Sequence, residues 1–208
     1  MRLELQNIGK RFNRDWIFRG VNLLLESGDK ICLIGANGSG KSTLMRVMCG
    51  YMDTNEGVLC IANGDTTISL DQLYKHISIA APYLDLPEDL TLEEAFAFHQ
   101  KFKPFASSID VTKMVDLLQI DHRNKAISLY SSGMKQRVKL AFAILSEVPL
   151  VFLDEPCTNL DDQGIQWYLE LINKYASDKI LVVCSNRREE EAPFADRLVN
   201  ILDYKKKA

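Results

Sequence analysis

The segment from Lys30 to Cys49 limits the possible folds of this chain more than any other part of the sequence. It begins with an uninterrupted apolar run, Ile31 to Ile34, which is typical of a strand buried on both faces of a sheet. The residues from Gly35 to Ser42 then fit the phosphate-loop spacing G-x-x-x-x-G-K-[ST], and "STLMRVMC" predicts a helix after them. The alternative is a glycine-rich turn that binds no ligand, and such a turn would require neither the strand before it nor the helix after it. The segment therefore predicts an α/β fold around a nucleoside triphosphate site.

The residue types of this loop suit the binding of phosphate groups. Glycines reach backbone dihedrals that other residues avoid, so successive N–H groups can form a concave nest at the positive end of a helix. Lys41 would reach the phosphates, and the hydroxyl of Ser42 would hold Mg²⁺. The residues expected to bind the nucleotide are Gly35, Ala36, Asn37, Gly38, Ser39, Gly40, Lys41, Ser42 and Thr43.

Strand and helix patterns alternate before and after a helical middle segment. The apolar runs "HISIAAP", "LVFLD" and "ILVVC" predict strands, with amphipathic helices between the later ones, which argues for a parallel sheet covered on both sides. Between Tyr83 and Tyr130 the signals are helical, and Thr91 with Glu94 forms a capping box. We expect one domain over residues 1–208, with a nucleotide-binding core of residues 1–82 and 131–208 and a helical subdomain of residues 83–130.

The composition argues against a nucleic-acid binder and against a membrane-spanning chain. The 25 basic and 28 acidic residues leave a net charge of −3. No apolar stretch approaches the ~18 residues needed to cross a bilayer, and no signal peptide is visible. The five cysteines show no C-x-x-C pairing, which favours reduced, buried thiols. We expect a cytoplasmic protein that contacts a membrane only through a partner.

Two later segments, "YSSGMKQRVKLAFAIL" and "PLVFLDEPCTNLDD", indicate the class of nucleotide-binding protein. Together with the phosphate loop they resemble the ATP-binding-cassette (ABC) ATPase family, and the resemblance covers essentially the whole chain. The family signature L-S-G-G-Q corresponds to residues 130–134, the Asp-Glu-Pro triplet to residues 154–156 and the closing Leu-Asp pair to residues 160–161. The resemblance implies a P-loop NTPase core with a mixed sheet wrapped by helices, and an inserted helical subdomain.

The acidic pair has the chemistry of a hydrolytic site. The apolar run Leu150 to Leu153 places Asp154 at the carboxyl end of a buried strand, where open α/β sheets put their ligand sites. A solvated turn is the alternative for an Asp-Glu pair. The resemblance implies that Asp154 orients the water shell of Mg²⁺ beside Ser42 and that Glu155 polarises the attacking water.

The signature residues lie far along the chain from the phosphate loop, and they suit phosphate binding at the start of a different helix. Ser131 and Gly133 open a helix whose hydroxyl, N–H groups and dipole suit a phosphate. A simple helix N-cap is the alternative role for Ser131. The resemblance implies that Ser131, Gly133 and Asp161 bind the ATP held by a second copy, in a head-to-tail dimer with ATP sandwiched between the subunits.

An aromatic residue ahead of the phosphate loop matches the position that family members stack on adenine. This residue is Phe12, and Trp16 is the nearby alternative. An aromatic face supplies affinity for adenine without many hydrogen bonds. An ordinary core position is the competing interpretation of Phe12.

Two sensing residues of the family are replaced in this sequence. The Gln of the Q-loop corresponds to Pro82, and the switch His corresponds to Asn186. Asn186 either takes the catalytic place of the His or caps the helix that begins "RREEE". Ser132 and Met134 also depart from the signature. These departures predict slow but real turnover and leave nucleotide binding intact.

The resemblance implies an ATP-binding and ATP-hydrolysing subunit of an ABC transporter, at the cytoplasmic inner face of the cell membrane. It would form a homodimer or heterodimer of ATPase subunits on a separately encoded transmembrane permease. One alternative is a soluble ABC ATPase acting on ribosomes or DNA, which usually has two fused cassettes or long coiled-coil insertions. The other is a regulator that binds ATP with slow turnover, which the replacements at Pro82 and Asn186 favour.

Three phenylalanines in the helical segment allow two interpretations. Phe98, Phe102 and Phe105 fall at i, i+4 and i+7, so we expect them to form the core of the helical subdomain. The alternative is a docking groove for a permease helix, rimmed by Tyr83 and the residues after Pro82.

Overall fold

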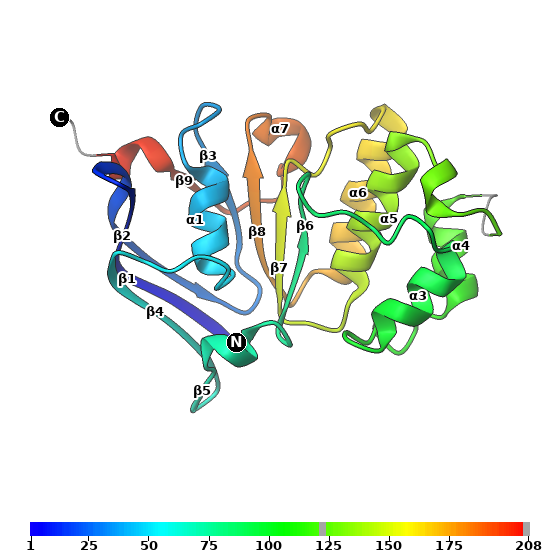
Figure 1. Cartoon of the computed structure of the whole chain (residues 1–208), viewed down its shortest axis with the longest axis horizontal. Coiled ribbons are helices and arrows are strands. Elements are labelled where there is room, and N and C mark those ends of the chain that lie inside the picture. The colour runs from blue at the N-terminus through cyan, green and yellow to red at the C-terminus, as the bar shows by residue number, and fades with distance from the viewer. Residues whose placement is uncertain (121–123, 206–208) are drawn as a thin grey trace.

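The computed structural model describes residues 1–120 and 124–205, which form two β-sheets with helices packed around them (Figure 1). The parallel sheet has the strand order β6-β7-β8-β3-β9, and the antiparallel sheet has the order β2-β1-β4-β5. The strands are β1 (Arg2–Phe12), β2 (Asp15–Glu26), β3 (Lys30–Ile34), β4 (Glu56–Asn63), β5 (Thr66–Thr67), β6 (Ile77–Ala80), β7 (Leu150–Asp154), β8 (Ile180–Ser185) and β9 (Arg197–Asn200). The helices are α1 (Lys41–Met48), α2 (Leu70–Leu73), α3 (Leu92–Gln100), α4 (Val111–Leu118), η1 (Ile127–Leu129), α5 (Ser132–Leu145), α6 (Asp162–Tyr175), α7 (Arg188–Glu191) and η2 (Ile201–Tyr204).

The parallel sheet confirms the α/β fold expected from the apolar runs. Every residue of β7 and β8 is buried, as expected of central strands that are covered on both faces. Asp154 pairs with Cys184, and Ile34 pairs with Ser185. The loops that follow β3, β7 and β8 therefore leave the sheet at the same edge.

Three strands are not identified by the sequence patterns: β2, β9 and the two-residue β5. In β2 the buried residues Phe18, Val21, Leu23 and Leu25 are interspersed with exposed or half-buried ones, because only one face of this strand meets the core. Such a pattern is a weaker signal than a continuous apolar run. β9 is a four-residue edge strand beside β3 and contributes only Val199 to the core.

The parallel sheet separates two hydrophobic cores. Figure 1 shows α1 and the antiparallel sheet on one side of it, and α5 and α6 on the other side, with α3 and α4 beyond α5. Successive residues of a strand point to opposite faces. Leu150 and Phe152 accordingly belong to the core around α1, whereas Val151 and Leu153 belong to the core around α5 and α6.

The helices α3, α4 and η1 all fall within residues 83–130. The capping box forms as the sequence predicts, since the Thr91 backbone N–H donates to Glu94 Oε2 at 2.8 Å and Thr91 Oγ1 accepts from the Glu94 N–H at 3.3 Å. In α4 the amphipathic face turns Met114 and Leu118 into the core. The boundaries of a separate helical subdomain remain a prediction.

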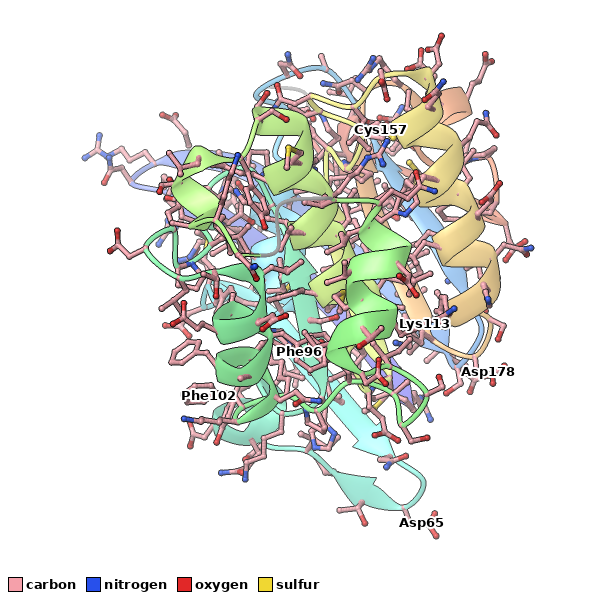
Figure 2. All side chains as sticks on the ribbon, turned by 90° about the vertical axis from the view of Figure 1, so that its right-hand side faces the viewer. Asp65, Phe96, Phe102, Lys113, Cys157 and Asp178 are labelled. Carbon is pink, nitrogen blue, oxygen red and sulfur yellow. The ribbon has the colours of Figure 1, made fainter. Side chains whose placement is uncertain are left out.

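The expectation that three phenylalanines form the core of this segment is correct for Phe105 but wrong for Phe98 and Phe102. Phe105 is 4% exposed, whereas Phe98 and Phe102 are 49% and 64% exposed. The reason is that α3 turns Phe96 inward, where its ring stacks on Phe105 at 4.6 Å between centroids. Figure 2 shows Phe96 between the helices and Phe102 at the outer edge.

Candidate active site

The phosphate loop leaves β3 and enters α1 through glycines in dihedral regions closed to most residues. Gly38 has a φ of 72° with open space where a side chain would begin. Gly40 has a φ of 109°, and a Cβ there would lie 2.4 Å from Ile17 Cγ2. Only glycine allows the backbone to take this path.

Lys41 is the buried centre of the loop, with 5% of its surface exposed. Its ammonium group donates to the carbonyl oxygens of Gly35 at 2.7 Å and Ala36 at 3.2 Å. It also donates to Oδ1 of Asn186 at 2.6 Å, and Asn186 directly follows the last residue of β8. A positive charge is thus held inside the loop by oxygens that a phosphate can replace.

Other features of the loop fit a bound phosphate chain. Ser39 is 3% exposed, and its Oγ has no hydrogen-bond partner among the described residues, so it is available to a ligand. α1 begins after Gly40 without a side-chain cap and has no acidic residue in its first turn. A cavity of about 320 Å³ lies in front of this helix end. Its lining is Ile17, Asn37, Gly38, Ser39, Gly40, Lys41, Ser42, Thr43 and Glu155.

Asp154 and Ser42 bring a carboxylate and a hydroxyl oxygen together beside this cavity. Asp154 is 4% exposed at the end of β7. Burial raises the pKa of Asp154, while a hydrogen bond with Ser42 and the charge of Lys41 oppose this shift. Hydroxyl and carboxylate oxygens are ligands that suit Mg²⁺, which usually takes one or two protein groups and the phosphates of its nucleotide. Among residues 1–120 and 124–205 there is no group of three or more His, Cys, Asp or Glu side chains that could hold a metal.

Glu155 follows directly and adopts an unusual backbone conformation. Its φ is 48°, in the left-handed region that non-glycine residues rarely occupy. The Glu155 N–H donates to the carbonyl oxygen of Cys184 at 2.9 Å, which ties this turn to β8. In this conformation Glu155 lines the cavity of the phosphate loop. Unusual backbone conformations of this kind cluster at functional sites.

Asn186 lies against the phosphate loop. Its Oδ1 accepts from Lys41, and its Nδ2 donates to Oδ1 of Asn37. At the start of the α7 segment it is Ser185 Oγ that accepts from the Arg187 N–H, at 2.8 Å. The described side-chain contacts of Asn186 therefore favour a role at the loop over a role as a helix cap.

Ser131, Gly133 and Asp161 lie together but away from the wall of the phosphate cavity. Ser131 caps α5 by accepting from the Met134 N–H at 3.2 Å, and Asp161 caps α6 by accepting from the Gly164 N–H at 2.7 Å. A Cβ on Gly133 would lie 2.9 Å from the carbonyl oxygen of Asn159, so the start of α5 packs against the loop before Asp161.

Phe12 ends β1 with 46% of its surface exposed, so the interpretation of Phe12 as a core residue is wrong. Lys10 Nζ lies 5.5 Å from its ring centroid. Trp16 is more enclosed, with the guanidinium of Arg19 at 4.7 Å from its ring. Ile17, which lines the phosphate cavity, is missed by the sequence analysis because its strand carries only an alternating pattern.

A second, more apolar cavity of about 240 Å³ lies between the end of β6, α3 and α5. Its lining includes Ala81, Leu84, Phe98, Phe102 and Lys139. Beside it, the ring of Tyr83 covers the guanidinium of Arg46 at 4.0 Å. We call this cavity the α3 groove.

Comparisons with known proteins agree with this geometry. A family model described as ABC transporter matches residues 18–158. ABC transporter A family member 7 of Dictyostelium discoideum is 27% identical over 182 residues, which are 85% of this chain but 22% of that relative. The "Probable ABC transporter ATP-binding protein PEB1C" of Campylobacter jejuni is 28% identical over 214 residues, 97% of this chain and 87% of the relative. The solved structure of MJ0796, described as a dimeric bacterial ABC transporter cassette, has a TM-score of 0.78 at 21% identity and covers 95% of this chain and 93% of that chain.

Within the described part of the chain, each helix is too short or too polar to cross a membrane.

Proposed function

The chain belongs to the ABC transporter family, and from this premise we propose that it powers a separately encoded membrane permease as one of two ATPase subunits. As a member of this family it binds ATP and is an ABC-type ATPase. The observation that carries the proposal is the meeting of three chain segments at one edge of the parallel sheet. These segments are the loop around Lys41, the turn with Asp154 and Glu155, and the residue Asn186.

The proposed site divides the chemistry among these segments. The loop and α1 bind the phosphates, and Ser42 and Asp154 would hold Mg²⁺. When bound, the ion supplies positive charge that neutralises the phosphate oxygens. Glu155 accepts a proton as a water oxygen bonds to the γ-phosphorus and the bond to the β–γ bridging oxygen breaks. Phe12 is proposed to stack on the adenine ring from its exposed position.

We propose that the functional unit is a head-to-tail dimer, either homodimer or heterodimer. Ser131, Gly133 and Asp161 lie away from the phosphate cavity of their own chain, and the N-terminal end of α5 suits a phosphate. A second copy can present these residues to the nucleotide. The similar cassette that is described as dimeric supports this arrangement.

The α3 groove is the proposed contact with the permease. Phe98 and Phe102 expose large aromatic surfaces at its wall, and an apolar groove is the usual receiver of an amphipathic helix. This contact would hold the protein at the cytoplasmic inner face of the cell membrane.

Glu155→Gln tests the proposal. The variant should keep its affinity for ATP and lose about 10²–10⁴-fold in turnover, because the general base is removed. A dimer should accumulate with Mg-ATP in gel filtration, since the sandwich closes but does not reopen. Unchanged turnover would remove Glu155 from this role.

A soluble or regulatory ABC ATPase with slow turnover is the second candidate. It is favoured by the neutral amide of Asn186 at Lys41 and by Pro82 in place of the family Gln. Phosphate release measured with the purified chain distinguishes the two, because a regulator would bind ATP stoichiometrically with almost no release.

A further inference from the structure

Glu191 is a buried carboxylate that the proposed chemistry does not use. It ends α7 with 2% of its surface exposed. Its Oε2 accepts from the hydroxyl of Ser185, and its Oε1 accepts from the backbone N–H of Cys157 at 3.3 Å. A guanidinium nitrogen of Arg187 lies 3.8 Å from Oε1. A buried carboxylate is costly unless such donors surround it.

The two groups that Glu191 binds belong to the two turns that carry the proposed chemistry. Cys157 lies shortly after Glu155, and the Thr158 N–H closes this turn on the Glu155 carbonyl oxygen at 3.1 Å. Ser185 ends β8 directly before Asn186. One side chain thus joins the turn after β7 to the turn after β8. Figure 1 shows α7 at the end of β8, on the edge where these turns lie.

The surroundings make this link rigid. Tyr168, which is fully buried in α6, donates its hydroxyl to the carbonyl oxygen of Glu191 at 2.9 Å. The side chain of Gln136, in α5, donates to the carbonyl oxygen of Pro156 at 2.7 Å and holds the same turn from the other side. Burial raises the pKa of Glu191, and the donors at Ser185 and Cys157 oppose this shift. Glu191 itself is absent from the lining of the phosphate cavity.

We propose that Glu191 is a positioning residue that fixes Glu155 and Asn186 relative to each other, so that the general base and the contact to Lys41 face the same phosphate. The proposal rests on the proposed ATPase site. Its physical basis is that displacement of a reacting group by about 1 Å can lower a rate by about 10²-fold. The single carboxylate accepts from both turns, so a side chain that cannot accept from both donors should loosen one turn relative to the other.

The test is Glu191→Gln, which keeps the size of the side chain but removes its charge and one acceptor. We expect turnover at saturating Mg-ATP to fall about 10-fold to 100-fold, with the Kd for ATP changed by less than about twofold. Glu190→Gln is the matched control, because Glu190 also pairs with Arg187, at 3.0 Å, but is exposed and makes no described contact with Cys157 or Ser185. Its turnover should equal that of the parent.

A double-mutant cycle separates positioning from a general loss of structure. If Glu191 acts through Glu155, Glu191→Gln should lower single-turnover hydrolysis only slightly further in the Glu155→Gln background. An equal fold-loss in both backgrounds would overturn the proposal, as would parental turnover in Glu191→Gln alone. If Glu191→Gln does not fold, Ser185→Ala decides, since it removes one of the two donors, and unchanged turnover there would also overturn the proposal. Failure of Glu155→Gln to lose activity would instead reject the proposed function.

Discussion

Asn186 brings a short and permanently neutral side chain to the ammonium group of Lys41. Charge-assisted hydrogen bonds are about twice as strong as neutral ones. A histidine at this position could offer a charged donor to the γ-phosphate, so Asn186→His should raise turnover about 5–30-fold, or ~1–2 kcal/mol in the transition state. Asn186→Ala should lower turnover, because Lys41 and Asn37 lose a partner.

The turnover of Asn186→His should also depend on pH. The imidazolium is the active form, so turnover should rise as pH falls through the ordinary range of an imidazole, about pH 6–7. The parent should lack this dependence. Turnover of the parent and both variants at saturating Mg-ATP, from pH 5.5 to 8, is the measurement. No gain with His and no loss with Ala would leave Asn186 with a structural role alone.

At the scale of single residues, the sequence predicts those whose chemistry is written in a local motif. Lys41, Ser42 and Asp154 are identifiable because a loop spacing or the end of an apolar run fixes their surroundings. Glu191 is not, because the two donors to its carboxylate come from two separate turns and its own helix has the sequence of a charged surface segment. Side-chain contacts between distant segments need the fold before they can be seen.

At the scale of elements, α3 is held against the end of α5 by a half-buried histidine. His99 stacks on Phe105 at 4.7 Å between centroids, and its Nε2 lies 2.8 Å from Ser146 Oγ. Burial lowers the pKa of His99 from 6.5 to about 4, and the charge of Lys103 acts in the same direction. The imidazole is thus neutral in the folded protein over most of the acidic range.

This histidine should make stability depend on pH. Between about pH 6.5 and 4 the unfolded chain binds a proton at His99 and the folded chain does not, so the free energy of unfolding should fall by on the order of 2 kcal/mol. Above about pH 6.5 His99 is neutral in both the folded and the unfolded chain, so this loss of stability is absent. Urea unfolding across this range checks the slope. His99→Gln should reduce the slope and His76→Gln should keep it. An unchanged slope in His99→Gln would assign the effect to other groups.

The proposed contact between the α3 groove and a permease can be tested by crosslinking. Tyr83 is 40% exposed next to the groove, so a cysteine at Tyr83 should capture the permease in the assembled complex. Val58, which is 55% exposed on the antiparallel sheet, provides the matched control. Cys60 is half-buried and is the native thiol to check in the parent. Capture from Val58 but not from Tyr83 would place the permease on the other side of the molecule.

The elements themselves divide into those that the sequence predicts and those that it does not. β7 and β8 are predicted because strands covered on both faces carry continuous apolar runs. β2 and β9 are not, since one meets the core on a single face and the other is a short edge strand. The prediction that Phe98 and Phe102 are core residues is wrong for a different reason. Phe98 lies in α3, but α3 ends at Gln100, so Phe102 and Phe105 do not continue its face, and Phe96 occupies the core position against Phe105.

At the scale of the whole molecule, the proposed dimer predicts that two inactive variants restore each other. In Glu155→Gln the base is lost, and in Ser131→Asp the helix cap is kept but a negative charge faces the phosphates. A mixed dimer has one site with both defects and one intact site. Mixing the variants should therefore recover up to about a quarter of parental turnover, because half of the dimers are mixed.

The control for this experiment is Ser131→Asn, which caps the helix without a charge and should lose less activity in its own homodimer than Ser131→Asp. Turnover is measured before and after the two inactive variants are mixed and allowed to exchange subunits. No recovery, with subunit exchange shown independently, would mean that each chain completes its own site.

The sheet between the two cores has a mechanical consequence. β7 contributes alternate side chains to both cores, so it cannot loosen unless both sides of the molecule loosen with it. Asp154 and Glu155 stand at the end of this strand, whereas Ser131 opens α5 and the α3 groove lies between α3, α5 and the end of β6. A displacement of the helical side would then pivot on the sheet. The α3 groove and the start of α5 would then move together, while Asp154 would keep its place at the end of β7.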